Sequence, residues 1–171
     1  ETTTGQAPYR ETTALRLAPG TGPYLATDLS ARMIEIAHEK LAATPVPGLS
    51  FAATTVEELV GAASDPRDAV LGFNYLHLVP DLDHVLAAIF QLVKPGGLFI
   101  SKTPCLGDMN PLIRMAIPFA RVVGKAPASV RSFTADELRS AIARAGFVVE
   151  LVEFHGTRGK DTRPFILARR P

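Results

Sequence analysis

Short apolar segments alternate with amphipathic segments along most of this chain, and this alternation constrains its fold more than any other feature. Residues 68–73 (DAVLGF) and 98–101 (LFIS) are near-continuous apolar runs, which are typical of strands buried on both faces. Residues 30–41 and 82–93 carry their apolar side chains at helical spacing. Strands and helices in alternation over 171 residues predict one α/β domain with a doubly wound, mostly parallel sheet.

The remaining elements follow from the same kind of pattern. Further strands are expected at 24–27, 49–55, 148–154 and 165–168, and further helices at 11–18, 56–63 and 134–145. Thr134 opens the last helix in a capping-box pattern with Glu137, and Gly146 ends it. The last two strands are joined by a link of only about nine residues, which permits an antiparallel hairpin but no parallel crossover.

Two segments stand apart from the alternation. Residues 1–10 are polar without periodicity and are interpreted as an arm. Residues 104–130 are rich in Pro, Gly and Met and interrupt the pattern, so we expect an inserted helical lid. Neither segment suggests a second core, and the prediction is a single domain over residues 1–171.

Composition excludes several classes of protein. No apolar run approaches the roughly 20 residues that a membrane helix needs. The single cysteine cannot form an internal disulfide and nothing indicates an oxidising compartment, so a cytoplasmic location is expected. The net charge of +1 with scattered basic residues argues against nucleic-acid binding, although a basic face for an anionic substrate stays open as an alternative. One Cys and four scattered His give no metal-ligand spacing, so no metal site is expected.

Four segments, in order, carry a family resemblance. They are residues 26–33 (ATDLSARM), 73–81 (FNYLHLVPD), 92–100 (LVKPGGLFI) and 133–147. Together they resemble the strand ends and turns of class I S-adenosylmethionine-dependent methyltransferases, in the branch that acts on small molecules. The resemblance covers about residues 11–171 and implies a Rossmann-like sheet. It also implies S-adenosylmethionine as cofactor and S-adenosylhomocysteine as product.

The resemblance places the ribose and adenine of the cofactor at the end of the second strand of the family's fold. Asp28 stands where a carboxylate accepts from both ribose hydroxyls. The alternative is that Asp28 only caps its turn, but Ser30 is better placed as the helix cap. Leu29 is included among the cofactor-binding residues. Met33 is a candidate to lie against adenine, although a Met at helical spacing is as readily part of the core.

Three more cofactor-binding candidates follow later strands. Thr55 and Val56 align with the segment that meets the adenine edge; family members often carry Asp in place of Thr55, and a hydroxyl accepts more weakly than a carboxylate. Asn74 follows the fourth-strand segment, near the methionine part of the cofactor, with strand capping as the alternative.

The acceptor side is less constrained. Met109, Met115 and Phe119 in the inserted segment would give an apolar, adaptable lining, which favours a small, partly apolar acceptor. His77 is the candidate general base, against the alternative of a histidine packed beside the strand. Cys105 is interpreted as a buried thiol rather than a nucleophile. The expected partners are a small-molecule acceptor and, as an open alternative, a second copy of the chain.

One motif of the family is missing. A first strand ending in a glycine-rich loop should lie about 20 residues before Asp28, but residues 6–10 (QAPYR) stand there with no apolar run before them. Either a segment between Arg10 and Glu11 is omitted, which we favour, or the chain lacks the loop. A sheet without this strand would leave unpaired edges on both sides of the gap. An intact mass of 18.3 kDa would contradict the omission.

Three functions compete at this point. The first is methyl transfer from S-adenosylmethionine to a small, partly apolar acceptor. The second is a methyltransferase-like module that binds no cofactor and serves interaction or regulation, which only the missing loop supports. The third is a nicotinamide-dependent oxidoreductase, against which the absence of G-x-G-x-x-G argues.

Overall fold

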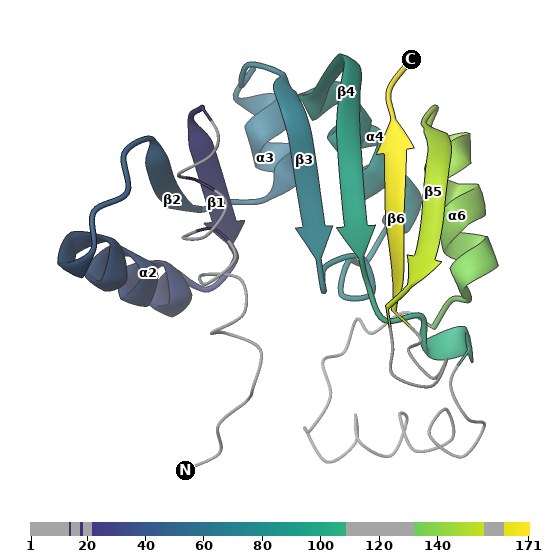
Figure 1. Cartoon of the computed structure of the whole chain (residues 1–171), viewed down its shortest axis with the longest axis horizontal. Helices are drawn as coiled ribbons and strands as arrows, with labels where there is room; N and C mark the ends of the chain where they lie inside the picture. The colour runs from purple at the N-terminus through teal and green to yellow at the C-terminus, as the bar shows by residue number, and fades with distance from the viewer. Residues whose placement is uncertain (1–13, 15–17, 19–21, 109–131, 156–162) are drawn as a thin grey trace. The chain divides into compact units, whose positions relative to one another are not determined.

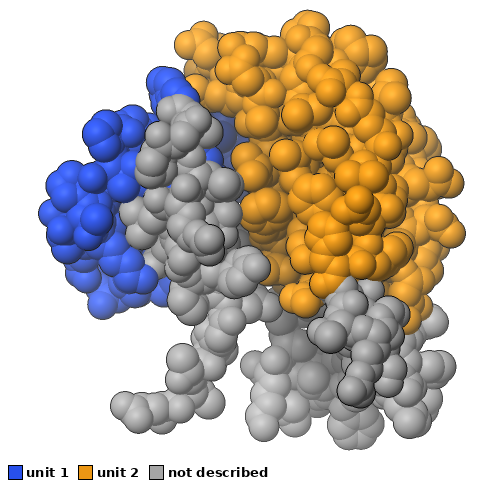
Figure 2. Space-filling model, viewed as in Figure 1, with its two compact units in different colours: residues 1–59 blue, residues 60–171 orange. Residues whose placement is uncertain are grey.

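The computed structural model describes residues 14, 18, 22–108, 132–155 and 163–171 of the chain. These residues have the α/β architecture that the apolar pattern predicted, with strands and helices in alternation up to residue 102 (Figure 1). They divide into two compact units, residues 1–59 and residues 60–171, and each unit has its own sheet (Figure 2).

The first unit is built on two parallel strands joined by a helix. Strand β1 (Tyr24–Asp28) pairs with β2 (Leu49–Ala53), and α2 (Ala31–Ala43) connects them. The hydroxyl of Ser30 accepts a hydrogen bond from the Met33 backbone N–H at 3.3 Å, which confirms Ser30 as the cap of α2. A short helix, α3 (Val56–Gly61), follows β2. The core of this unit gathers Ala14, Ala18, Leu49, Tyr24, Ala26, Leu41, Val46 and Phe51.

The second unit has a four-stranded sheet in the order β3-β4-β6-β5. Strands β3 (Arg67–Phe73) and β4 (Val93–Lys102) are parallel, whereas β6 (Pro164–Arg169) runs antiparallel to both β4 and β5 (Val148–Phe154). The chain direction therefore changes at the C-terminal strands, as the arrows of Figure 1 show. β5 and β6 are the two strands whose short link allowed only antiparallel pairing.

Two helices supply many of the buried side chains of the second unit. Helix α4 (Leu82–Leu92) begins after Asp81, whose carboxylate accepts from His84 N, and α6 (Ala135–Arg144) begins with the predicted capping box of Thr134 and Glu137. Helix α4 lies against β4 and β3, and α6 lies against β5 and β6. The buried set includes Val85, Leu86, Ile89, Leu138, Ile142, Phe99 and Ile166. Each such side chain contributes about 1.5–3 kcal/mol through burial.

The Lys94–Gly97 segment differs from the sequence prediction. It belongs to the segment 92–100 that resembles a turn into a strand of the family, but β4 already begins at Val93, which pairs with Arg67, and an irregularity separates that pair from the next one, Ala69 with Leu98. Gly96 has a φ of +77°, which a side chain would oppose. The residues Lys94–Gly97 therefore lie within β4, where they interrupt its regular pairing with β3.

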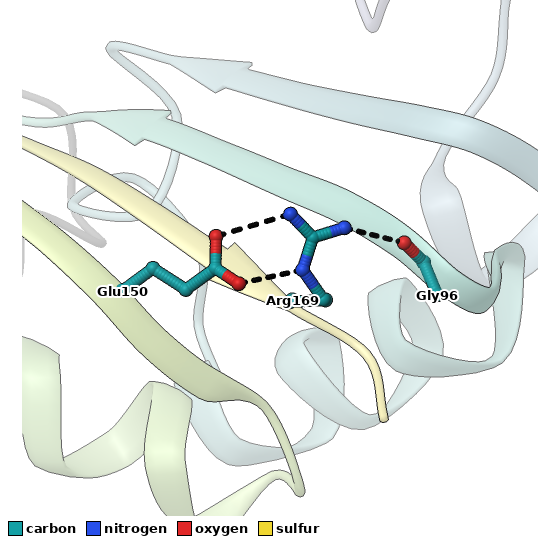
Figure 3. A network of polar contacts seen from close by, with 3 residues as sticks. All are labelled: Gly96, Glu150 and Arg169. Carbon is teal, nitrogen blue, oxygen red and sulfur yellow. Dashed lines mark hydrogen bonds and ion pairs between the residues drawn. The ribbon is translucent and has the colours of Figure 1, made fainter.

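Near the C-terminus two neighbouring arginines join parts of the second unit. The guanidinium of Arg169 forms a two-pronged ion pair with Glu150 on β5 and donates to the Gly96 carbonyl at the start of β4 (Figure 3). Arg170 donates to the carbonyls of Phe90 and Val93 at the C-terminal end of α4. Arg169 thus joins β5 and β6 to the start of β4, and Arg170 joins the C-terminus to the end of α4.

Asp108 links two elements that are distant in sequence. It ends the short 3-10 helix η2 (Leu106–Asp108), and its carboxylate accepts from Ala135 N at 2.7 Å, at the first turn of α6. The arm predicted at 1–10, most of the lid predicted at 104–130, and the proposed break between Arg10 and Glu11 lie outside the described residues.

Candidate functional site

The carboxyl ends of β1 and β2 lie side by side in the first unit. Asp28, the last residue of β1, is the register partner of Ala53, the last residue of β2. The segments that follow these two residues therefore start at the same edge of the sheet. Ligands of parallel α/β sheets bind beyond this edge. The edge brings Asp28 together with Thr55 and Val56, three of the predicted cofactor-binding residues.

Asp28 takes part in its own turn. Its Oδ1 atom accepts a hydrogen bond from the Ser30 backbone N–H at 2.9 Å, so the turn is closed two residues on. This bond fixes the direction of the carboxylate at the end of the strand. Turn capping and ribose binding are compatible, because a carboxylate has about four acceptor positions. The ligand role of Asp28 stays a prediction.

Two apolar side chains flank this carboxylate in sequence. Leu29 is 71% exposed, which is unusual for a large apolar residue. Met33, in the first turn of α2, is half-buried. An exposed leucine beside a turn carboxylate suits contact with an apolar ring. Neither contact with adenine is tested by the structure.

Beyond β2, a second capping box occupies the predicted adenine-edge segment. The Thr55 hydroxyl accepts from Glu58 N at 3.0 Å, and the Thr55 N–H donates to Glu58 Oε2 at 2.9 Å. The Thr54 hydroxyl donates to the same oxygen at 2.8 Å. The pattern Thr-x-x-Glu at the start of α3 is readable in the sequence, although Glu58 is not among the residues predicted to bind the cofactor. Val56 is the first residue of α3.

In the second unit, Asn74 directly follows β3. Its N–H donates to the Lys102 carbonyl at 2.8 Å, which extends the β3–β4 pairing by one bond, and its φ is +48°. Asn tolerates this left-handed conformation better than most residues. His77, three residues on, is 6% exposed, with its Nδ1 atom buried. The burial of His77 supports the alternative that this histidine packs beside the strand. Its role as a general base stays a prediction.

The predicted acceptor lining cannot be placed. Met109, Met115 and Phe119 lie outside the described residues. Cys105, at the start of this region, is fully buried, and its Sγ lies 3.7 Å from the Thr103 carbonyl. Burial, with smaller contributions from Asp108 and Glu137, raises the pKa of the Cys105 thiol to about 12. A thiol with this pKa is neutral near pH 7, which confirms the interpretation of Cys105 as a buried thiol.

The described residues contain neither a membrane-spanning helix nor a metal-binding cluster. That part of the chain has no helix of the length and apolar character needed to cross a bilayer. It also holds no group of three or more His, Cys, Asp and Glu side chains arranged to bind a metal ion.

The fold is that of the Rossmann-like methyltransferases. The methyltransferase of Haloferax volcanii, solved in complex with the Trm112 methyltransferase activator, superposes with a TM-score of 0.69 at 19% identity, over 95% of this chain and 79% of that one. A SAM-dependent methyltransferase of Methanosarcina mazei gives a TM-score of 0.66 at 18% identity, over 92% and 86% of the two chains.

A third structure carries a bound ligand. The magnesium protoporphyrin IX methyltransferase of Synechocystis, with bound SAH, gives a TM-score of 0.66 at 15% identity, over 91% of this chain and 68% of that one. At such identities these likenesses establish the fold alone.

Sequence comparison identifies the family. The family described as "Methyltransferase domain" matches residues 6–101, more than half of the chain. The chain therefore belongs to this family, within the class I S-adenosylmethionine-dependent methyltransferases. Methyltransferase nsrG of Aspergillus novofumigatus is 30% identical over 95 residues, which are 56% of this chain and 34% of that protein. The chain spans about a third of the length of this relative.

Proposed function

We propose that the chain transfers a methyl group from S-adenosylmethionine to a small, partly apolar acceptor. The observation that carries the proposal is the shared edge of β1 and β2, where Asp28 ends one strand and Thr55 and Val56 follow the other. This placement agrees with the roles that the family resemblance implies. Membership of the methyltransferase-domain family supports the same activity and does not favour a module that binds no cofactor.

The residues of this edge fit the chemistry of the cofactor. A carboxylate at the end of β1 accepts hydrogen bonds from the two ribose hydroxyls, and the Asp28 carboxylate is already oriented by its bond to Ser30 N. Leu29 and Met33 supply apolar surface for the adenine ring. We place Thr55 and Val56 at the edge of the adenine ring. Asn74 is proposed to contact the methionine part of the cofactor.

The protein's task in such a reaction is positioning. S-adenosylmethionine, when bound, would supply a methyl group activated by a sulfonium; the acceptor atom would bond to that methyl carbon in line while the S–CH3 bond breaks and S-adenosylhomocysteine leaves. Asp28 holds the ribose and thereby fixes the depth and rotation of the cofactor. Orientation of two reactants accounts for a large part of the rate enhancement in such transfers. His77 is proposed to take the acceptor's proton.

The small, partly apolar acceptor rests on the composition of the inserted segment. Met109, Met115 and Phe119 provide adaptable apolar side chains in the sequence that follows β4. A second copy of the chain is the proposed macromolecular partner. Identification of the acceptor calls for a methylation screen of small molecules with the purified gene product.

Calorimetric titration with S-adenosylhomocysteine tests the cofactor proposal. We expect micromolar binding, and we expect Asp28→Asn to weaken it at least about tenfold, because an amide accepts from only one side of the diol while it keeps the turn bond to Ser30. Asp65→Asn, a change of an exposed aspartate, is the matched control and should bind normally.

Three results would contradict the proposal. Equal affinity of Asp28→Asn and the unchanged protein would remove Asp28 from the site. Binding of NADH instead would favour an oxidoreductase. Binding of neither ligand by the gene product would favour an interaction module.

A further inference from the structure

Strand β5 forms one end of the four-stranded sheet of the second unit, as Figure 1 shows. In the part of the chain that the structure describes, β5 pairs with β6 on one side, and no strand pairs with its other side. A strand in this position presents a row of backbone N–H and C=O groups that another strand can bind. Strand β5 is therefore a candidate surface for pairing with a second chain.

Large exposed apolar side chains gather on this strand. Val148, Leu151 and Phe154 are 55%, 37% and 51% exposed, and they are three of the four large apolar residues that are exposed among the described residues. The strand at the other end of the same sheet, β3, has none of these four residues. β5 is therefore the end strand that gains more from a partner, because pairing removes apolar surface from water.

The features that usually keep edge strands apart are few in β5. Lysine, proline and free charges commonly have this function, but residues 148–154 contain neither Lys nor Pro. The two charged residues of the strand already have partners within the chain. Glu150 forms an ion pair with Arg169 (Figure 3), and the Glu153 carboxylate contacts the His155 ring. Neither carboxylate therefore acts as an isolated charge on the edge.

The alternation of side chains restricts how β5 can pair with its own copy. Successive side chains of a strand point to opposite faces, so an antiparallel pair about a two-fold axis is centred on a single residue. A centre at Leu151 would bring Val149, on the far side of the register irregularity of β5, opposite Glu153. A centre at Glu153 would set two carboxylates opposite each other. A centre at Val152 avoids both conflicts.

Centred on Val152, the pair keeps like charges apart and brings apolar side chains together. Leu151 lies opposite Glu153 of the second copy, and Glu150 lies opposite Phe154 of the second copy, so no two carboxylates are directly opposite. The two Leu151 side chains are diagonal neighbours within reach of each other. A parallel pair in register would instead place each glutamate beside its own copy. The charges of β5 therefore favour the antiparallel pair.

We propose that two copies of the chain pair through β5, antiparallel about a two-fold axis at Val152, and so join their sheets into one. The inference goes beyond methyl transfer and does not depend on where the cofactor binds. It gives the second copy that is proposed as a partner a defined docking surface. A contact through one strand is smaller than the standard protein interface of about 1,600 Å². We therefore expect a dissociation constant in the micromolar range.

Two substitutions at one exposed position test this arrangement. Leu151→Glu sets a carboxylate opposite Glu153 of the second copy, whereas Leu151→Lys sets an ammonium group there. Both variants remove the same apolar side chain and add one charge, so the difference between them depends on which residue faces position 151. Because the pair is symmetric, each contact occurs twice and its effect is doubled.

The measured quantity is the monomer–dimer dissociation constant of the full chain, from sedimentation equilibrium. We expect the constant of Leu151→Glu to exceed that of Leu151→Lys at least about tenfold, since repulsion replaces attraction at two symmetric contacts. Ala69→Glu adds a carboxylate to an exposed position of β3, at the other end of the sheet, and is the control that should leave the constant unchanged. The melting temperature of each variant reports whether it is folded.

Three results would overturn the inference. The first is an unchanged chain that stays monomeric up to about 300 µM, well above a micromolar constant. The second is a dimer that neither Leu151→Glu nor Leu151→Lys affects, since its interface would lie elsewhere. The third is equal weakening by the two variants, which would exclude Glu153 as the residue opposite Leu151. All three concern the dimer alone, so the methyltransferase proposal stands or falls separately, by the binding of S-adenosylhomocysteine.

Discussion

At the end of β3, Asn74 adopts a φ of +48°, in the left-handed region. Alanine is strained there by about 1 kcal/mol or more, whereas glycine is not. Asn74→Ala and Asn74→Gly both remove the amide side chain, so their difference isolates the backbone term. We expect the alanine variant to have a free energy of unfolding about 1 kcal/mol lower than that of the glycine variant, measured by urea denaturation.

A glycine variant as unstable as the alanine variant would contradict this account of Asn74. If the amide side chain binds the cofactor as proposed, both variants should also lose affinity for S-adenosylhomocysteine by a similar factor. The two measurements thus separate the backbone role of Asn74 from its proposed ligand role.

Cys105 is a residue whose environment predicts its reactivity. Its pKa of about 12 lies above the ordinary value of 9.0, because burial disfavours the thiolate. Between about pH 9 and 12 the Cys105 thiol therefore stays protonated in the folded state and loses its proton in the unfolded state. The free energy of unfolding consequently falls as the pH rises through that range. At pH 8 we expect negligible reaction with a thiol reagent in the native protein and full reaction in urea. Rapid reaction of the native thiol would contradict the buried assignment.

Among the elements, α4 depends on a residue far away in sequence. Arg170 donates to the carbonyls of Phe90 and Val93 at 2.8 and 2.7 Å, and its guanidinium lies 4.4 Å from the centre of the Phe90 ring. Arg170→Ala leaves these carbonyls without the donor, and we expect a loss of about 1–3 kcal/mol in the free energy of unfolding.

Arg139→Ala provides the control for the loss of an arginine. Arg139 contacts Asp136 at 3.8 Å on the surface of α6, and both side chains are more than half exposed. Such pairs contribute little, so its effect should stay within about 0.5 kcal/mol. Equal destabilisation by the two variants would contradict the capping role of Arg170.

The end of α6 depends on the absence of a side chain. Gly146 has a φ of +105°, and a Cβ placed there would lie 2.9 Å from the Phe90 ring. Strain and overlap together predict that Gly146→Ala destabilises the protein by about 2 kcal/mol or more in thermal unfolding. At Gly61, the last residue of α3, a Cβ would meet nothing within 4 Å. Gly61→Ala should therefore leave stability equal or higher, and a similar loss at both glycines would contradict the argument.

At the scale of the whole molecule, local signals were sufficient for most elements. Ser30 and Thr134 cap the helices they were predicted to cap, because a cap bonds to residues only three positions on. The strand predicted at 148–154 has those bounds in the structure, since three valines and a phenylalanine, all of which favour strands, make up most of the run.

Contacts between distant residues were not readable in the sequence. Val93 pairs with Arg67 and Arg170 caps α4, and both contacts depend on the tertiary fold. At the candidate site, Asp28 was identified through its position at a strand end. Glu58 was missed, although its capping box with Thr55 is a local pattern that the sequence contains.

The two units differ in how much apolar surface they bury. Among the described residues of the first unit, the buried apolar side chains are three alanines and one leucine, Ala14, Ala18, Ala37 and Leu49, and the sheet of this unit has two strands. The second unit buries Phe99, Ile166 and most of the apolar side chains of α4 and α6 around four strands. A two-stranded sheet with a small core is marginally stable by itself. Local opening should therefore cost less in the first unit.

Hydrogen exchange followed by mass spectrometry measures this difference directly. We expect the amides of β1 and β2 to exchange faster than those of β4 and β6 in the free protein. A ligand that binds at the edge of β1 and β2 stabilises the first unit by mass action. Saturating S-adenosylhomocysteine should therefore slow exchange in residues 24–28 and 49–53 and leave β5, on the edge of the other sheet, unchanged. Asp28→Asn should remove most of that protection. Protection by the ligand confined to the second unit would contradict the placement of the cofactor beside Asp28.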